Sequence, residues 1–198
     1  MNVAFSANGK QLVHTTSKDQ SNWSAPQVVD VMAGLNALDL ESPNVFYDDA
    51  GKQFIVTWSC TLAKNAIQAF QEDVEHNPRI WYATTKDFTS FSESKLLFDN
   101  NYAARDAQIL KLDGSHYALL HNDQTWPMQN IRLAFAATPL GPWGPSTDAF
   151  TPKGTHSPNA VFSGGEWWIY HSGGLVRTRA FWNFVEVPGG PQVGVFTR

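Results

Sequence analysis

The sequence predicts an all-β protein of the β-propeller class, with about three four-stranded antiparallel blades in its 198 residues. Two different motifs recur in the same order along the chain, which is the main basis for this prediction. Aromatic residues make up 13% of the chain, beside 14 glycines and 11 prolines, and this composition is typical of short strands joined by turns. A β-sandwich with several similar hairpins is the alternative, but the ordered recurrence of both motifs favours the propeller.

The first motif is a β-hairpin that occurs three times. Each copy has an apolar run, a turn that contains glycine, and a second run rich in aromatic residues, over residues 42–59, 105–121 and 157–172. The turns are Ala50-Gly51, Asp113-Gly114 and Gly164-Gly165. Glycine readily adopts the positive φ that a tight hairpin requires, so each copy predicts two antiparallel strands.

The second motif is a turn rich in Ser and Thr that follows the hairpin. Residues 16–24 match residues 84–92 position for position, and residues 136–144 form a degenerate third copy. Strand-like runs precede the second and third copies, at 79–83 and 131–135. The hairpin, the third strand and the turn with its short edge strand together make one four-stranded blade.

These motifs place the whole chain, 1–198, in a single partial propeller domain with a repeat of about 60 residues. The blade repeats are approximately 1–30, 42–98, 105–150 and 157–198. The longer second repeat contains a candidate short helix at 63–70, and residues 173–198 do not align with the pattern. Because a closed propeller has typically about four to eight blades, we expect an incomplete propeller whose open blade edges promote self-association.

Composition and charge exclude several classes of partner. The net charge is −4 and no cluster of Lys or Arg is found, so we expect no nucleic acid partner. No apolar run approaches the roughly 20 residues that a bilayer requires, so we expect no membrane span. The N-terminal residues lack the basic and apolar regions of a signal peptide, and the localisation stays open. Cys60 is the one cysteine, which excludes an intrachain disulfide.

A family resemblance rests on five passages of the chain. They are residues 41–48, 55–59, 79–88, 104–107 and 140–143, of which 79–88 is the most specific. Over roughly residues 3–172 the chain resembles the five-bladed propeller of the family 43 glycoside hydrolases and their relatives. The resemblance implies carbohydrate as the partner. It also implies a glycoside hydrolase similar to inverting arabinofuranosidases and xylosidases, which hydrolyse O-glycosyl bonds in polysaccharide side chains.

The resemblance also implies catalytic residues. In that family an Asp acts as general base, a Glu acts as general acid, and a further Asp tunes the pKa of the acid; acid and base of inverting enzymes stand about 6.5–9.5 Å apart. Asp106 matches the Asp that tunes the pKa of the acid. The alternative interpretation is that Asp106 only ends a loop ahead of a strand. His156 occupies the position of the acid, where it could donate a proton near neutral pH, bind a ligand or cap the strand. Glu41 also begins a blade and could replace the acid or bind a sugar.

In that family the general base comes from a strand of the first blade, and this strand would align before Val3. We therefore expect the base outside this chain. A histidine also stands in place of the general acid. These two departures leave open an alternative function, a non-catalytic propeller fragment that binds carbohydrate or another ligand.

Residues at the same rim of the blades are candidates for substrate binding: Trp58, Arg105, His121, Asp123 and His171. Trp58, Trp81, Trp126 and Trp182 have rings that could stack on a sugar, with core packing as the alternative for each. Arg105 could keep the neighbouring Asp106 ionised. We predict no cofactor and no catalytic metal, although His121, Asp123, His156 and His171 leave open a structural cation near the propeller axis.

Overall fold

The structure is a computed structural model that describes residues 2–7, 9–65, 67–68, 74–75, 77–125 and 129–189. Within these residues the regular structure is antiparallel β-strand, apart from a 3-10 turn at Ala63–Asn65, so the all-β prediction is confirmed. The chain forms two compact units, Met1–Ala107 and Gln108–Arg198. The sequence predicts a single propeller domain that includes both units, and this stays a prediction. No helix in the described part of the chain is long and apolar enough to cross a membrane.

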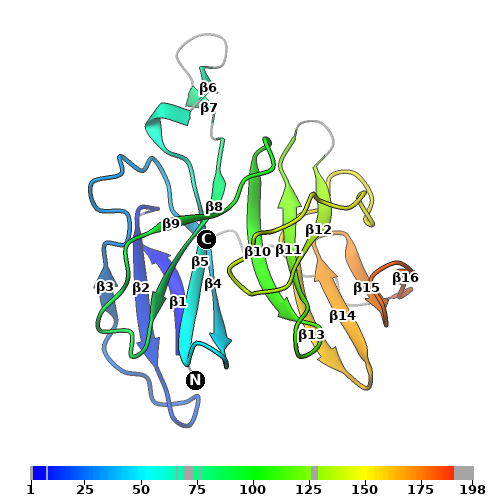
Figure 1. The fold of residues 1–198 in the computed structure, drawn as a ribbon, viewed down its shortest axis with the longest axis horizontal. Helices are drawn as coiled ribbons and strands as arrows, with labels where there is room; N and C mark the ends of the chain where they lie inside the picture. The colour runs from blue at the N-terminus through cyan, green and yellow to red at the C-terminus, as the bar shows by residue number, and fades with distance from the viewer. Residues whose placement is uncertain are drawn as a thin grey trace. The chain divides into compact units, whose positions relative to one another are not determined.

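The first unit contains two main antiparallel sheets, whose strands are labelled in Figure 1. The first sheet has the order β1 (Asn2–Ala7), β2 (Gln11–Thr16) and β3 (Gln27–Val29). The second has the order β4 (Glu41–Asp48), β5 (Gln53–Cys60), β8 (Arg79–Thr85) and β9 (Lys95–Phe98). A two-stranded sheet of β6 (Ile67–Gln68) and β7 (Val74–Glu75) lies in the connection between β5 and β8. The sequence suggests a short helix at 63–70. In the described residues of this segment the structure has a 3-10 turn at Ala63–Asn65 and the strand β6, so the helix prediction is wrong there.

The β4–β5 hairpin closes through the turn that the sequence predicts. Asp48 accepts a hydrogen bond from the backbone N–H of Ala50 at 3.1 Å. A Cβ atom on Gly51 would meet the ends of the Asp48 and Gln53 side chains, which would have to shift to admit it. The residue of this turn with a positive φ is Lys52, at 49°, and not the glycine that the sequence predicts. From this turn the two strands pair back to Glu41, which lies opposite Ser59 beyond a register shift between Glu41 and Asn44.

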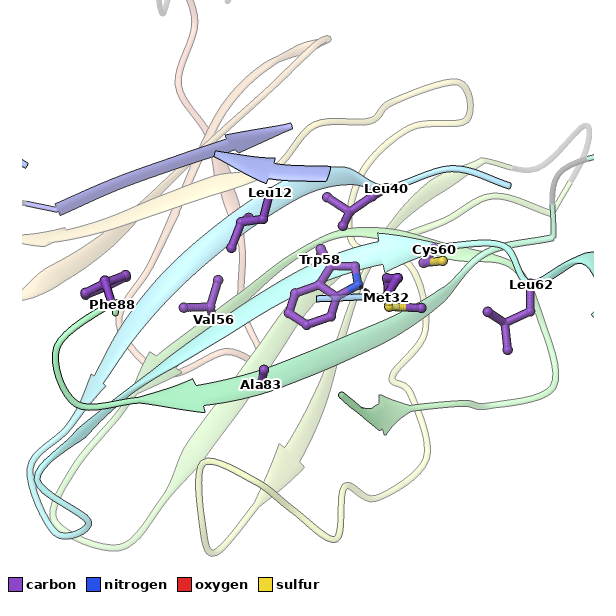
Figure 2. Close-up of a cluster of buried hydrophobic side chains, with 9 residues drawn as sticks. All are labelled: Leu12, Met32, Leu40, Val56, Trp58, Cys60, Leu62, Ala83 and Phe88. Atoms are coloured by element: carbon purple, nitrogen blue, oxygen red, sulfur yellow. Dashed lines mark hydrogen bonds between the residues drawn. The ribbon is translucent and has the colours of Figure 1, made fainter. Parts of the chain in front are cut away.

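Figure 2 shows the hydrophobic core of the first unit, with Trp58 among side chains from several strands and loops. Trp58 is 1% exposed, and its Nε1–H donates to the sulfur of Met32 at 3.3 Å. No face of the indole ring is open to a ligand. The prediction of Trp58 as a substrate-binding residue is therefore wrong, because its strand is buried on both faces at this point: residues 55–60 are all buried.

The second motif has the same local structure in both of its matching copies. The hydroxyl oxygen of Ser17 accepts the backbone N–H of Gln20 at 2.8 Å, and that of Thr85 accepts the N–H of Phe88 at 2.9 Å. Gln20 and Phe88 have nearly equal positive φ angles, 63° and 61°. In each copy an aspartate accepts the following backbone N–H groups, which lowers its pKa: Asp19 and Asp87. The match predicted between residues 16–24 and 84–92 is confirmed.

The second unit also contains two antiparallel sheets (Figure 1). One has the order β10 (Ala104–Lys111), β11 (Tyr117–Asp123) and β12 (Asn130–Ala136), with the start of β10 counted in the first unit. The other has the order β13 (Asn159–Ser163), β14 (Glu166–His171), β15 (Gly174–Thr178) and β16 (Val185–Glu186). Side chains from both sheets form the core of this unit: Leu110, Ala118, Leu120, Ile131, Leu133, Ala160, Ile169 and Val176.

A further copy of the Ser/Thr turn follows β15, in the segment that the sequence does not align. The hydroxyl of Thr178 accepts the backbone N–H groups of Ala180 and Phe181 at 3.2 and 2.9 Å. Phe181 has a φ of 60°, as Phe88 has 61°. The blade pattern thus continues past His171, as a third strand, the turn and a short edge strand.

Candidate functional site

Three blade starts share one backbone feature. Each has a residue with a left-handed φ directly after the residue that the sequence places at the rim: Ser42 (51°), Asp106 (54°) and Ser157 (55°). Residues other than glycine rarely adopt this conformation, and such residues concentrate at functional sites. The candidate residues are therefore Glu41 and Arg105 with the residues that follow them in the first unit, and His156 and Ser157, described separately, in the second unit.

Glu41 and Arg105 form an ion pair within the first unit, in which Nη1 of Arg105 donates to Oε2 of Glu41. The Glu41 side chain is 42% exposed and the Arg105 side chain 23% exposed. The Nε of Arg105 is buried and has no hydrogen-bond acceptor among the described residues. The pair is half open to solvent, so a ligand can reach the carboxylate of Glu41.

Asp106 is held from two sides. The hydroxyl of Ser42 donates to Oδ1 of Asp106, and the backbone N–H of Asp106 donates to the hydroxyl oxygen of Ser59 at 3.1 Å. Both the carboxylate and the backbone of Asp106 are therefore fixed. We name this group of five residues the strand-start cluster: Glu41, Ser42, Ser59, Arg105 and Asp106.

The strand-start cluster brings together two carboxylates, one guanidinium and two hydroxyls on a partly exposed surface. Carboxylates accept, and guanidinium groups donate, strong charge-assisted hydrogen bonds. A sugar presents hydroxyls that both donate and accept. This arrangement can therefore orient a polyhydroxylated ligand. The structure places Glu41, Arg105 and Asp106 together in the first unit, and their role in a site stays a prediction.

His156 lies in the second unit, at the start of its last sheet. Its backbone N–H donates to the hydroxyl oxygen of Ser172 at 2.9 Å, and its Nδ1 lies 3.0 Å from the hydroxyl of Ser157. The side chain is partly exposed. That His156 faces a substrate together with Asp106 stays a prediction.

The structure corrects three other predicted substrate-binding residues. His121 is fully buried, with Nδ1 at 3.1 Å from the carbonyl of Leu119 and Nε2 at 3.2 Å from the hydroxyl of Ser146. Its burial lowers the pKa of His121 to about 4. Asp123 is 5% exposed and accepts a hydrogen bond from Arg132 at 2.9 Å. These side chains make internal contacts in the second unit and present no surface to a ligand.

His171 is also buried, at 3% exposure, and burial lowers the pKa of its imidazole. Its Nδ1 accepts the backbone N–H of Gly173 at 3.1 Å, which braces the β14–β15 turn. The prediction of His171 as a substrate-binding residue is wrong for the same reason as that of His121. Among the remaining tryptophans, Trp126 lies outside the described residues, Trp81 is half-buried, and Trp182 is 85% exposed.

The described part of the chain supplies no ligand set for a structural cation. No three side chains of His, Cys, Asp or Glu converge on one point within these residues. His121 and Asp123, two of the residues considered for such a site, are buried with the partners described above.

Sequence reasoning missed the hydroxyls that fix the blade starts. Ser59 accepts the N–H of Asp106, and Ser172 accepts the N–H of His156. Both serines follow the last large side chain of a second hairpin strand, Trp58 and His171. This shared position is a signal that could have identified them.

Comparison with known proteins supports a carbohydrate-active fold. A family model described as a probable glycosyl hydrolase domain, related to family 43, matches residues 2–157. A sequence search of curated proteins finds no match to this chain.

Solved structures show the same fold at low sequence identity. A thermostable family 43 glycoside hydrolase superposes with a TM-score of 0.75 at 14% identity, over 96% of this chain and 69% of its own. An exo-β-1,3-galactanase from Phanerochaete chrysosporium, solved with β-1,3-galactotriose, has a TM-score of 0.67 at 15% identity, over 89% and 42% of the chains. A family 43 β-xylosidase/α-arabinofuranosidase from a compost microbial metagenome, solved with xylotriose, has a TM-score of 0.53 at 12% identity, over 71% and 43%. These matches establish the β-propeller fold, and this chain spans less than half the length of the last two enzymes.

Proposed function

Because this chain belongs to the family of probable glycosyl hydrolase domains related to family 43, we propose that it hydrolyses arabinofuranosyl or xylosyl bonds in polysaccharide side chains. The chain is a glycoside hydrolase-like domain. The family 43 enzyme solved with xylotriose carries both of these activities in its name, which supports the proposed substrate class.

The observation that carries the proposal is the strand-start cluster. Asp106 has a carboxylate held by Ser42 and a backbone held by Ser59. A carboxylate fixed in this way can orient a sugar hydroxyl, and its charge can raise the pKa of a neighbouring acid. We assign Asp106 the role that the family resemblance implies, orientation of the substrate and of the proton donor.

Glu41 and Arg105 have a different role in this proposal. To act as general acid, Glu41 would have to carry a proton, which removes the charge that Arg105 contacts. Binding of sugar hydroxyls requires no such loss, because the ion pair leaves Glu41 partly exposed. We therefore assign Glu41 and Arg105 to substrate binding and His156 to protonation of the leaving oxygen. In an inverting hydrolysis a separate base takes a proton from the attacking water, and the described residues are assigned no such base.

The proposal is tested by hydrolysis of nitrophenyl α-L-arabinofuranoside and nitrophenyl β-D-xyloside. Because no described residue is assigned as the base, the attacking water gives its proton to bulk solvent, and we expect slow but measurable turnover with one of them. We expect Asp106→Asn to lower kcat/KM about 100-fold or more. The matched control is Asp99→Asn, because Asp99 pairs with Arg79 at 2.7 Å near the same end of the second sheet but on its outer strands. Turnover should be unchanged in the control.

Two results would contradict this assignment. Unchanged turnover in Asp106→Asn would remove Asp106 from the site. Binding of the sugars without any turnover, measured by calorimetry, would favour the non-catalytic carbohydrate-binding function instead.

A further inference from the structure

Trp182 is the most exposed large hydrophobic side chain among the described residues, at 85% exposure. It follows the Thr178 turn in the second unit, next to Phe181, which contacts Phe135 and Trp167 through ring edges and faces. Phe181 therefore packs against the unit, while the next side chain, Trp182, extends into solvent. A tryptophan exposed to this degree at a rigid turn is unusual, because indole rings are highly buried on average.

Two arginines share one carboxylate beside this indole. Arg177 donates from Nη1 to Oε2 of Glu166 at 2.9 Å, and Arg179 donates from Nε to Oε1 at 2.8 Å. These contacts lower the pKa of Glu166, which keeps it charged. Two guanidinium groups and one carboxylate leave one positive charge at this place, in a chain whose net charge is −4.

Arg179 has donors that Glu166 does not use. Its side chain is 78% exposed, and within the described residues its Nε alone makes a hydrogen bond. Its two Nη groups form a planar fork that matches the two oxygens of a carboxylate. A surface cleft of about 360 Å³ is bordered by Glu166, Arg177, Arg179, Trp182 and Asn183. This volume lies within the usual range for ligand pockets, roughly 300–1,000 Å³.

This cleft is separate from the rim on which the catalytic residues are proposed. Glu166 begins β14 and His171 ends it, and Thr178 lies opposite Trp167. The arginine pair therefore lies at the opposite end of β14 from the turn that leads to Ser172 and His156. A strand of this length spans roughly 17 Å. A ligand at Trp182 is therefore not a substrate at the His156 end of the same sheet.

We propose that the Trp182 cleft is a second carbohydrate-binding site, specific for a sugar that carries a carboxylate, such as a uronic acid residue. The apolar face of the sugar stacks on the indole of Trp182, and its carboxylate binds the Nη groups of Arg179. The side-chain amide of Asn183 lines the cleft and can bind hydroxyls of the sugar, while Glu166 holds the two arginines. Neutral sugars lack the group that Arg179 recognises and bind more weakly.

The test compares trigalacturonic acid with its methyl ester by calorimetry on the full chain near neutral pH. The two ligands differ in charge while the sugar rings are the same. We expect the acid to bind at least about tenfold more tightly than the ester, and we expect only the acid to lose affinity at about 0.5 M NaCl. Arg179→Gln should lower the affinity for the acid to that for the ester, and Trp182→Ala should weaken both.

Trp23→Ala is the matched control, because Trp23 is 42% exposed at the equivalent turn of the first unit, which has no arginine pair. Trp23→Ala should leave the affinities for the acid and for the ester unchanged. Asp106→Asn should also leave them unchanged, so that binding at the Trp182 cleft is distinguished from the catalysis proposed at Asp106. Equal affinity for the acid and the ester would overturn the proposal, and so would equal losses in Trp182→Ala and Trp23→Ala. The proposal would also be overturned if the acid did not bind and Trp182→Ala had a lower molecular mass in solution than the natural chain. That result would mean that Trp182 forms a contact between two copies of the chain.

Discussion

His121 makes the stability of the second unit depend on pH. The imidazole is fully buried, and its contacts suit the neutral form: Nδ1–H donates to the carbonyl of Leu119, and Nε2 accepts the hydroxyl of Ser146. Burial lowers the pKa of His121 to about 4, from an ordinary value of 6.5 that applies to the unfolded chain. Between these two values the unfolded state binds a proton that the folded state does not bind.

The sign and size of the effect follow from this difference. Stability rises with pH wherever the unfolded state binds more protons, so acidification from about pH 6.5 to about pH 4 destabilises the fold. Each unit of pKa difference is worth about 1.4 kcal/mol, which gives about 3 kcal/mol in total for His121. Below about pH 4 the folded state binds the proton too, and the loss stops growing.

The assay is urea unfolding at a series of pH values, for the natural chain and for His121→Gln. The glutamine amide keeps a group near Ser146 but does not titrate. The difference in free energy of unfolding between the two proteins should shrink by about 3 kcal/mol as the pH falls from about 7.5 to about 4. His14 and His171, whose pKa values burial also lowers, contribute equally to both proteins and cancel in this difference.

His116→Gln is the control, because the side chain of His116 is 68% exposed whereas that of His121 is fully buried. Its pH profile should follow that of the natural chain. Parallel profiles for the natural chain and His121→Gln would refute the reasoning, since they would mean that His121 is not held neutral by burial.

Two further predictions concern the turns and the core. Replacement of the turn hydroxyl by a methyl group, in Thr85→Val and in Thr178→Val, should in each case lower the free energy of unfolding by about 1 kcal/mol, because backbone N–H groups lose their acceptor. Ser90→Ala, which removes an exposed hydroxyl from the Thr85 turn, should have little effect, and a similar loss there would contradict this. Burial, together with the charge of Asp39, raises the pKa of the Cys60 thiol to about 12, so a thiol reagent at about pH 8 should not modify the folded chain but should react within minutes once urea unfolds it. Rapid modification of the folded chain would show that Cys60 is accessible.

Local chemistry made the hairpins and the matching turns predictable. The Asp48 carboxylate at the β4–β5 turn, and the Ser17 and Thr85 hydroxyls at the second motif, accept backbone N–H groups a few residues away. Signals of this kind are complete within a short window of sequence. The residues at the starts of β4 and β10 could be located for the same reason, because each follows from its hairpin.

Burial at the strand ends could not be predicted in the same way. A half-buried strand alternates between a core face and a solvent face, but β11 is buried at every position and β5 at its last six. Both faces of such a strand are covered, so period-two alternation does not separate ligand-facing from core-facing residues. The sequence pattern therefore places Trp58, His121 and Asp123 at a rim, whereas the structure buries all three.

The Thr178 turn was missed because of its spacing. In the second sheet, residues 61–78 connect β5 to β8, whereas only Ser172 and Gly173 connect β14 to β15. The distance from hairpin to turn thus differs between the copies, although the turns themselves agree. A search for a hydroxyl followed three residues later by an aromatic side chain, as in Thr85 and Phe88, finds Thr178 and Phe181 without any assumption about spacing.

The repeated turn also separates what a blade must keep from what it is free to change. One hydroxyl at the first position holds the backbone in all three turns. An aspartate adds further acceptors in the first two turns, whereas Ala180 stands at that position in the last, so only the hydroxyl is common to the three. The first turn carries Lys18, the second Lys86, and the last Arg179 and Trp182 on the same scaffold. The exposed positions of one turn can therefore differ in chemistry from those of the others while the same hydroxyl contact keeps the backbone of the turn.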